Sequence, residues 1–312
     1  MSADILVMGK MLLRVMDNLR ENFTVHRYED IADKDAFFAE HGAAIRAIGT
    51  DALHGCSAAL MDRLPNLEIV GSCGVGYDSI DVEEARKRGL RVTTTPDVLN
   101  DATAELAIAL MMALARDVVR ADQFVRAGGW LNGGYPLTGQ IAGARAGIVG
   151  LGRIGKEIAT RCAALKMEIA YHGRSEQPDQ PYRYYGDLVE MARDVDWLVV
   201  IAPGTASTAK LISAEVIDAL GPEGMLVNVA RGTLVDEDAL VAALKEGRLG
   251  GAALDVFADE PNVPEALFAM DNVVLSPHQG SATEKTRQAM AELVVENLVA
   301  HFAGKDLPTP LV

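Results

Sequence analysis

"ARAGIVGLGRIGKEIATRCAALK", residues 144–166, contains three glycines at the spacing G-x-G-x-x-G. A short apolar run ends at Gly150, and a helical pattern starts directly after the turn. In a dinucleotide-binding turn, the first glycine permits the bend and the second lets the backbone approach a pyrophosphate. The third, here Gly155, lets the helix pack closely on the strand. The alternative is an ordinary glycine-rich turn, so the interpretation depends on the segments around it.

Apolar runs of strand length occur on both sides of this turn. One series covers residues 5–9, 23–28, 44–49, 67–73 and 90–95, and a second covers 144–150, 168–172, 197–202, 225–230, 251–257 and 272–276. Helical patterns separate most of the runs, and this alternation is typical of parallel sheets covered by helices on both faces. We therefore expect an α/β chain with two doubly wound parallel-sheet domains.

The connection between the two series predicts the domain organisation. Pro96 ends the fifth strand, and Asp101 or Thr103 is expected to cap a long apolar helix that ends near Gly128. A second long helix, expected over 281–305, suits a return to the first domain. We expect a flavodoxin-like substrate-binding domain over 1–98 and 284–312. An inserted Rossmann domain would cover 99–283, with ligands bound in the cleft between them.

Composition narrows the possible partners and the location of the chain. With 29 Lys and Arg against 44 Asp and Glu, the formal charge of −15 disfavours nucleic acid and anionic membranes. The start lacks a signal-peptide pattern, and no apolar stretch is long enough to span a bilayer. Cys56, Cys73 and Cys162 are scattered, which favours buried thiols and a cytoplasmic location. No cluster has metal-ligand spacing, so no metal is expected.

The sequence "YHGRS", residues 171–175, stands where an NAD-binding fold usually places an acid that holds the adenosine ribose. Gly173 lies 18 residues after Gly155 and removes that negative charge. Arg174 offers a bidentate fork to a 2′-phosphate, and Ser175 offers a hydroxyl donor. We therefore predict that NADP(H) is preferred over NAD(H). The alternative is that Arg174 points into solvent and Glu176 binds the ribose of NAD.

Three segments at the ends of later strands carry the catalytic candidates. "NVARGTLVDEDAL" contains Arg231, "ALDVFADEP" contains Asp255 and Glu260, and "LSPHQGS" contains His278. A histidine is the natural proton donor at neutral pH, and a neighbouring carboxylate would stabilise its charged form. Glu260 could be that neighbour, although 18 residues separate the two. The alternatives are a surface ion pair for Arg231, a solvated acid at Glu260 and a merely hydrogen-bonded His278.

Five motifs extend this interpretation over essentially the whole chain: "GSCGVGYDSID", "GLGRIG", "NVARGTLVDEDAL", "GAALDVFADEP" and "SPHQGSAT". With them the chain resembles the D-isomer-specific 2-hydroxyacid dehydrogenases, and among these the NADPH-dependent hydroxyphenylpyruvate, hydroxypyruvate and glyoxylate reductases. The resemblance implies that Arg231 binds the substrate carboxylate and polarises the ketone. It also implies that His278 protonates the carbonyl oxygen and that Glu260 pairs with His278.

The same resemblance implies the binding residues. Backbone groups of Val75 and Gly76 would bind the substrate carboxylate from the other domain, and Asp255 would hold the nicotinamide carboxamide. Closure of the two domains would then exclude water from the reacting centre. The implied cofactor site comprises Thr103, Gly150, Leu151, Gly152, Arg153, Ile154, Gly155, Arg174, Ser175, Ala202, Pro203, Thr208, Val229, Ala230, Asp255 and Gly280.

The expected activity is NADPH-dependent reduction of a small 2-keto acid to the D-2-hydroxy acid, an EC 1.1.1 reaction. Glyoxylate, hydroxypyruvate and an aryl pyruvate all remain possible, because loops 50–55, 96–100 and 128–139 shape the substrate pocket. One alternative is an NAD-dependent phosphoglycerate or D-lactate dehydrogenase. The other is a dinucleotide-sensing protein similar to transcriptional corepressors of the same fold, for which this chain lacks long flanking tails.

The apolar helix from Thr103 to about Arg120 suggests a homodimer. Its residues Met111, Met112 and Leu114 make it more hydrophobic than one covered face requires. The alternative is a helix fully buried within one chain. Trp130 and Tyr135 could reach the site of a neighbouring subunit, or they could be packing residues of their own chain.

Overall fold

The computed structural model describes residues 3–312, and the chain forms two compact units. Unit 1 comprises the residues up to Leu99 together with Thr283–Val312, and unit 2 comprises Asn100–Ala282. The first part of the chain and its last helix therefore share one unit, although the whole of unit 2 separates them in sequence.

Unit 1 is built on a five-stranded parallel sheet in the order β2-β1-β3-β4-β5. This is the strand order of flavodoxin-like folds, and it confirms a doubly wound sheet in this part of the chain. The strands are β1 (Asp4–Val7), β2 (Thr24–Arg27), β3 (Ile45–Asp51), β4 (Ile69–Cys73) and β5 (Arg91–Thr93).

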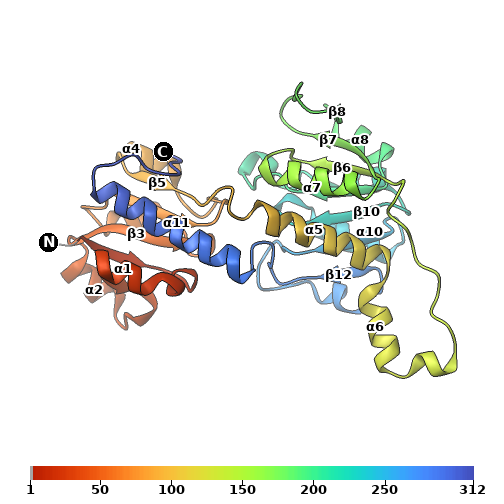
Figure 1. The fold of residues 1–312 in the computed structure, drawn as a ribbon, viewed down its shortest axis with the longest axis horizontal. Coiled ribbons are helices and arrows are strands. Elements are labelled where there is room, and N and C mark those ends of the chain that lie inside the picture. Colours follow the sequence, from red (N-terminus) through yellow and green to blue (C-terminus); the bar gives the residue numbers. More distant parts are fainter. Residues whose placement is uncertain (1–2) are drawn as a thin grey trace. The chain divides into compact units, whose positions relative to one another are not determined.

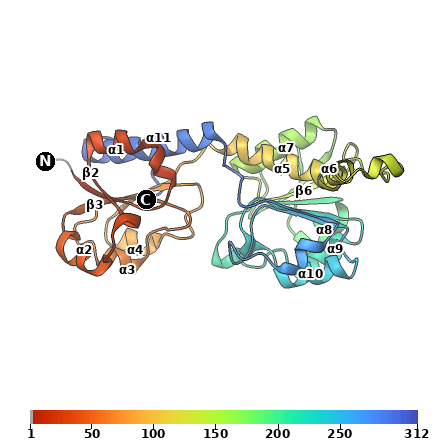
Figure 2. The ribbon, with the colours of Figure 1, turned by 90° about the horizontal axis from the view of Figure 1, so that it is seen from below.

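Helices cover both faces of this sheet, with α1 and α11 on one side and α2, α3 and α4 on the other (Figure 2). The elements are η1 (Met11–Val15), α1 (Met16–Asn22), η2 (Tyr28–Asp30), α2 (Lys34–His41), α3 (Ala58–Asp62), α4 (Val82–Lys87) and α11 (Glu284–Phe302), where η marks a 3₁₀ turn. Asp33, Ser57, Asp81 and Thr283 each accept a first-turn N–H at the start of a helix. Close packing keeps α11 in this unit, because a Cβ at Gly71 of β4 would lie 3.0 Å from Val294 of α11.

Unit 2 is built on a seven-stranded parallel sheet in the order β12-β11-β10-β9-β6-β7-β8. Counted within the unit this is 3-2-1-4-5-6-7, the Rossmann order with one further strand. The strands are β6 (Arg145–Val149), β7 (Glu168–His172), β8 (Arg183–Tyr185), β9 (Trp197–Val200), β10 (Met225–Asn228), β11 (Gly251–Leu254) and β12 (Val273–Leu275). The sequence predicted six of them. It missed β8, because three residues are too few to show a strand pattern.

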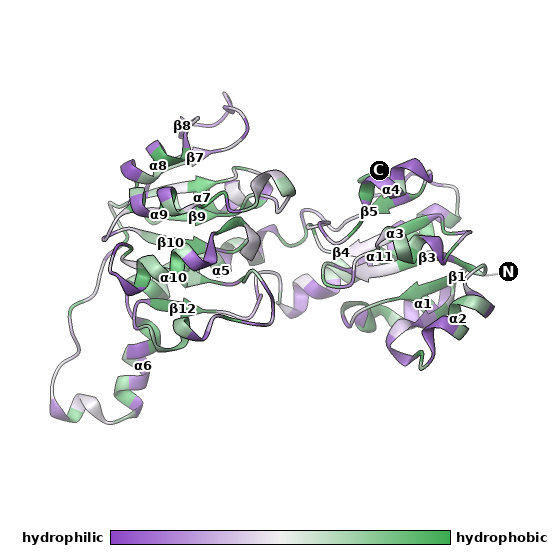
Figure 3. Cartoon of the chain, turned by 180° about the vertical axis from the view of Figure 1, so that it is seen from behind, coloured by the Kyte–Doolittle hydropathy of each residue, from purple (hydrophilic) through white to green (hydrophobic). Residues whose placement is uncertain are grey.

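In unit 2, α5 and α7 lie on one face of the sheet, and α8, α9 and α10 lie on the other (Figures 1 and 2). The elements are α5 (Asn100–Ala115), α6 (Val118–Arg126), η3 (Gly129–Asn132), α7 (Arg153–Ala164), α8 (Leu188–Asp194), η4 (Ala206–Thr208), α9 (Ala214–Leu220), η5 (Gly232–Leu234), α10 (Glu237–Lys245) and η6 (Glu265–Ala269). Each face has its own apolar core. The central strands β9 and β10, which contribute to both, are largely hydrophobic (Figure 3), and β10 ends in the polar Asn228.

The prediction of one long helix up to Gly128 was wrong. Helix α5 ends at Ala115, and α6 begins at Val118 after Asp117, which has a left-handed backbone with φ +49°. One residue in this conformation ends the run of helical hydrogen bonds, so the chain changes direction there. The predicted caps were wrong as well, because Asp101 and Thr103 both lie inside the first turns of α5.

Candidate active site

The glycine turn between β6 and α7 is tightly built. A Cβ at Gly150, where φ is +100°, would lie 2.7 Å from the Cα of Ala202, and a Cβ at Gly155 would lie 2.2 Å from the Gly150 carbonyl oxygen. At Gly152, by contrast, no heavy atom of the described residues lies within 4 Å of the Cβ position. Gly152 is also the N-cap of α7 and has no side chain to satisfy the first-turn N–H groups. Open space next to these donors fits the pyrophosphate of a dinucleotide.

The loop after β7 presents the residues expected to choose between NAD and NADP. A Cβ at Gly173 would meet open space among the residues described, and Arg174, Ser175 and Glu176 are all exposed. Because β6 and β7 are adjacent parallel strands, their carboxyl ends lie at the same edge of the sheet. The loop therefore stands beside the glycine turn, and both Arg174 and Glu176 are accessible to a ligand there.

Arg231 lies on a turn that a buried asparagine shapes. The Asn228 side chain, at the end of β10, donates to the Arg231 carbonyl (2.9 Å) and accepts from the Ala230 N–H (3.1 Å). The Arg231 guanidinium donates through Nη1 to the Ala230 carbonyl (2.7 Å). A Cβ at Gly204 would lie 2.8 Å from the Arg231 Cγ, so the absence of a side chain there makes room for the arginine.

Asn228 is a site residue that was not predicted from the sequence. The one sign of it in the sequence is that Asn228 is the only polar residue in the apolar run "MLVNVA".

His278 and Glu260 are in direct contact. The His278 Nδ1 lies 2.7 Å from the Glu260 Oε2, and the Glu260 Oε1 accepts the Phe257 N–H (3.1 Å). Burial acts to raise the pKa of Glu260, but the hydrogen bond and charge of His278, the Phe257 N–H and the charge of Arg231 outweigh it and lower that pKa. With Nδ1 engaged by the carboxylate, the His278 Nε2 is the ring atom positioned to exchange a proton with a substrate.

Asp255 holds the loop that carries His278. Its buried carboxylate accepts from the Ser276 hydroxyl (2.6 Å) and the Gln279 N–H (2.7 Å) at Oδ1, and from the Gly280 N–H (2.8 Å) at Oδ2. The Asp255 carbonyl accepts the His278 N–H (2.8 Å). Donors among the described residues thus use two lone-pair sites at Oδ1 and one at Oδ2, so Oδ2 has capacity for one further donor.

The other cofactor candidates of unit 2 lie at the same edge of the sheet. Ala202 and Pro203 follow β9, and the Thr208 hydroxyl donates to the Pro203 carbonyl (2.8 Å). Val229 and Ala230 follow β10 and are buried. Thr103 of α5 also approaches this edge, because a Cβ at Gly280 would lie 3.4 Å from both the Thr103 Cγ2 and the Asp255 Oδ2.

Val75 and Gly76 lie in unit 1, on the loop after β4, where Val75 is exposed. The loop is anchored by the Thr95 N–H, which donates to the Gly74 carbonyl (2.9 Å).

A second ordered loop follows β3. The Asp51 carboxylate accepts the Leu53 and His54 N–H groups and lies 2.8 Å from the His54 Nδ1, which leaves Leu53 exposed at the tip. This Asp51–His54 pair was not predicted from the sequence.

Residues 3–312 show no reactive cysteine, no metal-binding cluster and no membrane-spanning helix. Burial raises the pKa of each cysteine thiol to about 12, so none is a nucleophile near neutral pH. These described residues include no group of three or more His, Cys, Asp or Glu side chains that could hold a metal ion. Nor do they include a helix with the length and apolar character needed to span a bilayer.

Comparison with known proteins gives one consistent result. Residues 108–280 match the family model described as D-isomer specific 2-hydroxyacid dehydrogenase, NAD binding domain. The chain is 49% identical to the hydroxyphenylpyruvate reductase of Plectranthus scutellarioides over 99% of this chain and 98% of that protein. It is 47% identical to the glyoxylate/hydroxypyruvate reductase A HPR2 of Arabidopsis thaliana over 100% of this chain and 99% of that one.

A solved structure is similar over the same extent. It is that of the NADPH-dependent glyoxylate/hydroxypyruvate reductase of Sinorhizobium meliloti in complex with NADP and malonate. It has a TM-score of 0.95 and 46% identity, and the match covers 100% of this chain and 97% of that one.

Proposed function

This chain belongs to the D-isomer specific 2-hydroxyacid dehydrogenase family, and on that premise we propose that it uses NADPH to reduce a small 2-keto acid to the D-2-hydroxy acid. Glyoxylate, hydroxypyruvate and an aryl pyruvate are the candidate substrates, because relatives named for their reduction match nearly the whole chain. The observation that carries the proposal is the 2.7 Å contact between His278 and Glu260, with the charge of Arg231 close enough to lower the pKa of that carboxyl.

Each of the three residues has a distinct task in this proposal. The Arg231 guanidinium binds the substrate carboxylate and polarises the ketone, for which its planar fork of donors is suited. His278 donates a proton from Nε2 to the carbonyl oxygen, and Glu260 stabilises the protonated ring and fixes its orientation. In unit 1, the backbone N–H groups of Val75 and Gly76 are proposed to bind the substrate carboxylate.

The nicotinamide, when bound, supplies the hydride. In the chain itself, the first turn of α7 binds the pyrophosphate, and the Asp255 Oδ2 accepts from the carboxamide. Thr103, Ala202, Pro203, Thr208, Val229, Ala230 and Gly280 are proposed to complete the contacts at this edge of the sheet.

NADPH is the proposed coenzyme because the loop after β7 offers no acid at position 173 and an exposed guanidinium at position 174. A charge-assisted contact of Arg174 with a 2′-phosphate is worth ~1.5–3 kcal/mol, which is roughly 10- to 150-fold in affinity. Glu176, also exposed, is the competing residue that would favour NAD. The double variant Gly173→Asp with Arg174→Ala is expected to reverse the preference.

Steady-state kinetics with a panel of substrates tests the function directly. Glyoxylate, hydroxypyruvate, 4-hydroxyphenylpyruvate and pyruvate are each tried with NADPH and with NADH, and the product is resolved by chiral chromatography. We expect a D-2-hydroxy acid and a lower KM for NADPH. Equal or better catalytic efficiency with NADH would contradict the coenzyme assignment. Dinucleotide binding without turnover of any keto acid would indicate the corepressor-like alternative.

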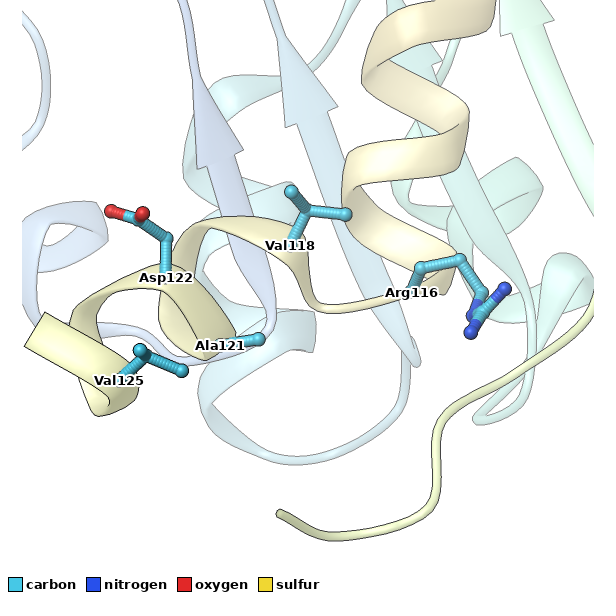
Figure 4. A pocket seen from close by; sticks show the side chains of 5 residues that line it. All are labelled: Arg116, Val118, Ala121, Asp122 and Val125. Atoms are coloured by element: carbon cyan, nitrogen blue, oxygen red, sulfur yellow. The ribbon is translucent and has the colours of Figure 1, made fainter. Parts of the chain in front are cut away.

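We further propose that the protein is a homodimer, assembled through α6 and the segment 129–139 rather than through α5. Met111 of α5 is fully buried in the core of unit 2, so burial within the chain accounts for part of the excess hydrophobicity of α5. Met112 of α5 is 37% exposed, but more exposed apolar side chains lie just after the helix, at Val118, Val119, Val125, Trp130, Leu131 and Leu137. A shallow hollow on α6 is lined by Arg116, Val118, Ala121, Asp122 and Val125 (Figure 4).

Tyr135 belongs to its own chain in this arrangement. Its hydroxyl donates to the Asp117 carboxylate, and its ring packs edge-on against Phe124 of α6, with 5.2 Å between the centroids. These contacts account for Tyr135 as a packing residue. Trp130, in contrast, is 70% exposed and is available to a second copy.

A further inference from the structure

The segment after β7 turns back and makes contact with the glycine turn through one side chain. The Gln177 Nε2 donates to the carbonyl of Leu151 (2.8 Å). Leu151 is the residue between the first two glycines of the motif. The Gln177 N–H donates to the hydroxyl of Tyr171 (2.7 Å), whose ring is buried in the core of unit 2. Gln177 therefore joins the end of this loop to the turn and to the interior at the same time.

Two further contacts hold the same loop. At its start, the Tyr184 hydroxyl of β8 donates to the Gly173 carbonyl (3.2 Å). Just after the loop, the Asp179 Oδ2 lies 3.8 Å from the Nζ of Lys156, which is in the first turns of α7. Arg174, Ser175 and Glu176 lie between these anchor points and are exposed. The loop is thus fixed at its ends, while its three central side chains face solvent.

We propose that Gln177 is a positioning residue for coenzyme choice, a role that rests on the proposed use of NADPH. By tying residues 173–177 to the glycine turn, it holds Arg174 and Ser175 where a 2′-phosphate would lie. It also keeps Glu176 away from the ribose.

Preorganisation is the physical basis of this effect. Fixing a loop before binding removes its conformational entropy from the cost of association. Without the hydrogen bond to Leu151, the loop samples more arrangements. Some of these bring the carboxylate of Glu176 near the nucleotide, where it repels phosphate and accepts from ribose hydroxyls. Loss of the contact should therefore weaken binding of a 2′-phosphate more than binding of the rest of the nucleotide.

The discriminating experiment measures two adenosine fragments by isothermal titration calorimetry with the full-length protein. The fragments are 2′,5′-ADP, which carries the 2′-phosphate, and 5′-AMP, which lacks it. Gln177→Met keeps the length of the side chain and removes the donor, and Gln177→Ala removes the side chain altogether. For both variants we expect 2′,5′-ADP to bind ~5–10-fold more weakly and 5′-AMP to remain within ~2-fold of the unmodified protein.

Gln180→Ala is the matched control. The Gln180 side chain lies in the same segment but donates to Asp179 (2.8 Å), and its removal leaves both the Asp179–Lys156 ion pair and the Gln177–Leu151 hydrogen bond in place. This variant should bind both fragments as the unmodified protein does. Kinetics give a second readout: Gln177→Met should raise the KM for NADPH ~5–10-fold and leave kcat at saturating NADPH nearly unchanged, because the His278–Glu260 pair is untouched.

The possible outcomes separate the two proposals. If the unmodified protein binds 2′,5′-ADP no better than 5′-AMP, the assignment of NADPH fails and the role of Gln177 fails with it. If the unmodified protein prefers 2′,5′-ADP and the Gln177 variants keep the same preference, only the positioning role is overturned. Equal weakening of both fragments would also overturn it, because Gln177 would then support the glycine turn and not the phosphate loop.

Discussion

At the scale of single residues, His278 is the proposed proton donor, and its surroundings explain why substitution there should affect chemistry more than folding. The side chain is 42% exposed, its backbone N–H is held by the Asp255 carbonyl, and its left-handed backbone (φ +54°) is one that asparagine adopts readily. His278→Asn should therefore fold and bind NADPH normally. It should reduce keto acids ~10²–10⁴-fold more slowly, because the general acid is lost. Turnover and NADPH fluorescence titration measure the two properties, and near-normal turnover would contradict the assignment.

Glu260 should control the pH dependence of the reaction. In Glu260→Gln the His278 ring faces a neutral amide instead of a carboxylate, and we expect reduction to fade at lower pH. The amide keeps the size of the side chain, so protein folding should change little. An unchanged pH profile of kcat/KM would show that the pair does not carry the proton.

A stability measurement provides a second test of the same residue. The pKa of Glu260 in the folded protein lies below its ordinary value of 4.5, so folding favours the ionised carboxyl. That stabilisation is present above pH 4.5 and is lost as the pH falls through the lowered value. In Glu260→Gln, the fall in the free energy of unfolding that this carboxyl causes at low pH should be absent. Denaturation of both proteins at several pH values would detect the difference.

The sequence singles out Arg231, Glu260 and His278 because each follows a strand in a distinctive motif, and in the structure Glu260 and His278 are in contact. It did not predict the residues that hold them. Asn228 and Ser276 act by hydrogen bonds that depend on where a turn folds back, and such contacts leave no periodic pattern. For the same reason Asp255 was expected only to bind the nicotinamide, whereas in the structure its carboxylate accepts three donors from the His278 loop.

At the scale of elements, the strands were predictable because buried parallel strands form short apolar runs. Helix boundaries were less predictable, because the backbone conformation of one residue can end a helix. Asp117 interrupts a run of apolar residues that could continue as a helix, and its φ of +49° is not evident from composition. Strand β8 forms because its backbone pairs with β7, although its own sequence has no strand pattern.

Another left-handed residue, Lys166, follows the end of α7. Lys166 follows the helix with φ +63°, a left-handed conformation that costs a residue with a Cβ roughly 1–2 kcal/mol. Its side chain is exposed and lies outside the proposed site. Lys166→Gly should therefore raise the melting temperature of unit 2 by about 2–4 °C, measured by calorimetry. Lys166→Ala is the control and should give no gain, since alanine keeps the Cβ. A lower melting temperature for the glycine variant would show that the strain is negligible.

At the scale of the whole molecule, charge opposes self-association. Each chain carries a formal charge of −15, so two copies repel each other, and a dimer requires apolar contact to offset that repulsion. Salt screens the repulsion without weakening the burial of apolar side chains. The dimer should therefore become tighter as sodium chloride is raised from low to physiological concentration, which sedimentation velocity can measure. Weakening with salt would indicate that charge pairs and not apolar contacts hold the two copies together.

The exposed apolar side chains indicate where the two copies meet. Leu131 is 92% exposed and Val125 is 52% exposed, so neither contributes much to the folding of its own chain. The double variant Val125→Glu with Leu131→Glu places two carboxylates in the proposed interface, where their desolvation and mutual repulsion oppose association. Light scattering at micromolar concentration should give the mass of a dimer for the unmodified protein and of a monomer for the variant. The circular dichroism spectrum of the variant should stay the same, while its melting temperature should no longer depend on protein concentration, because the stabilisation by association is lost. Met112→Glu, on the exposed face of α5, is the matched control and should remain dimeric if α6 and the segment 129–139 form the interface. A dimer that survives the double variant but is lost with Met112→Glu would place the contact on α5.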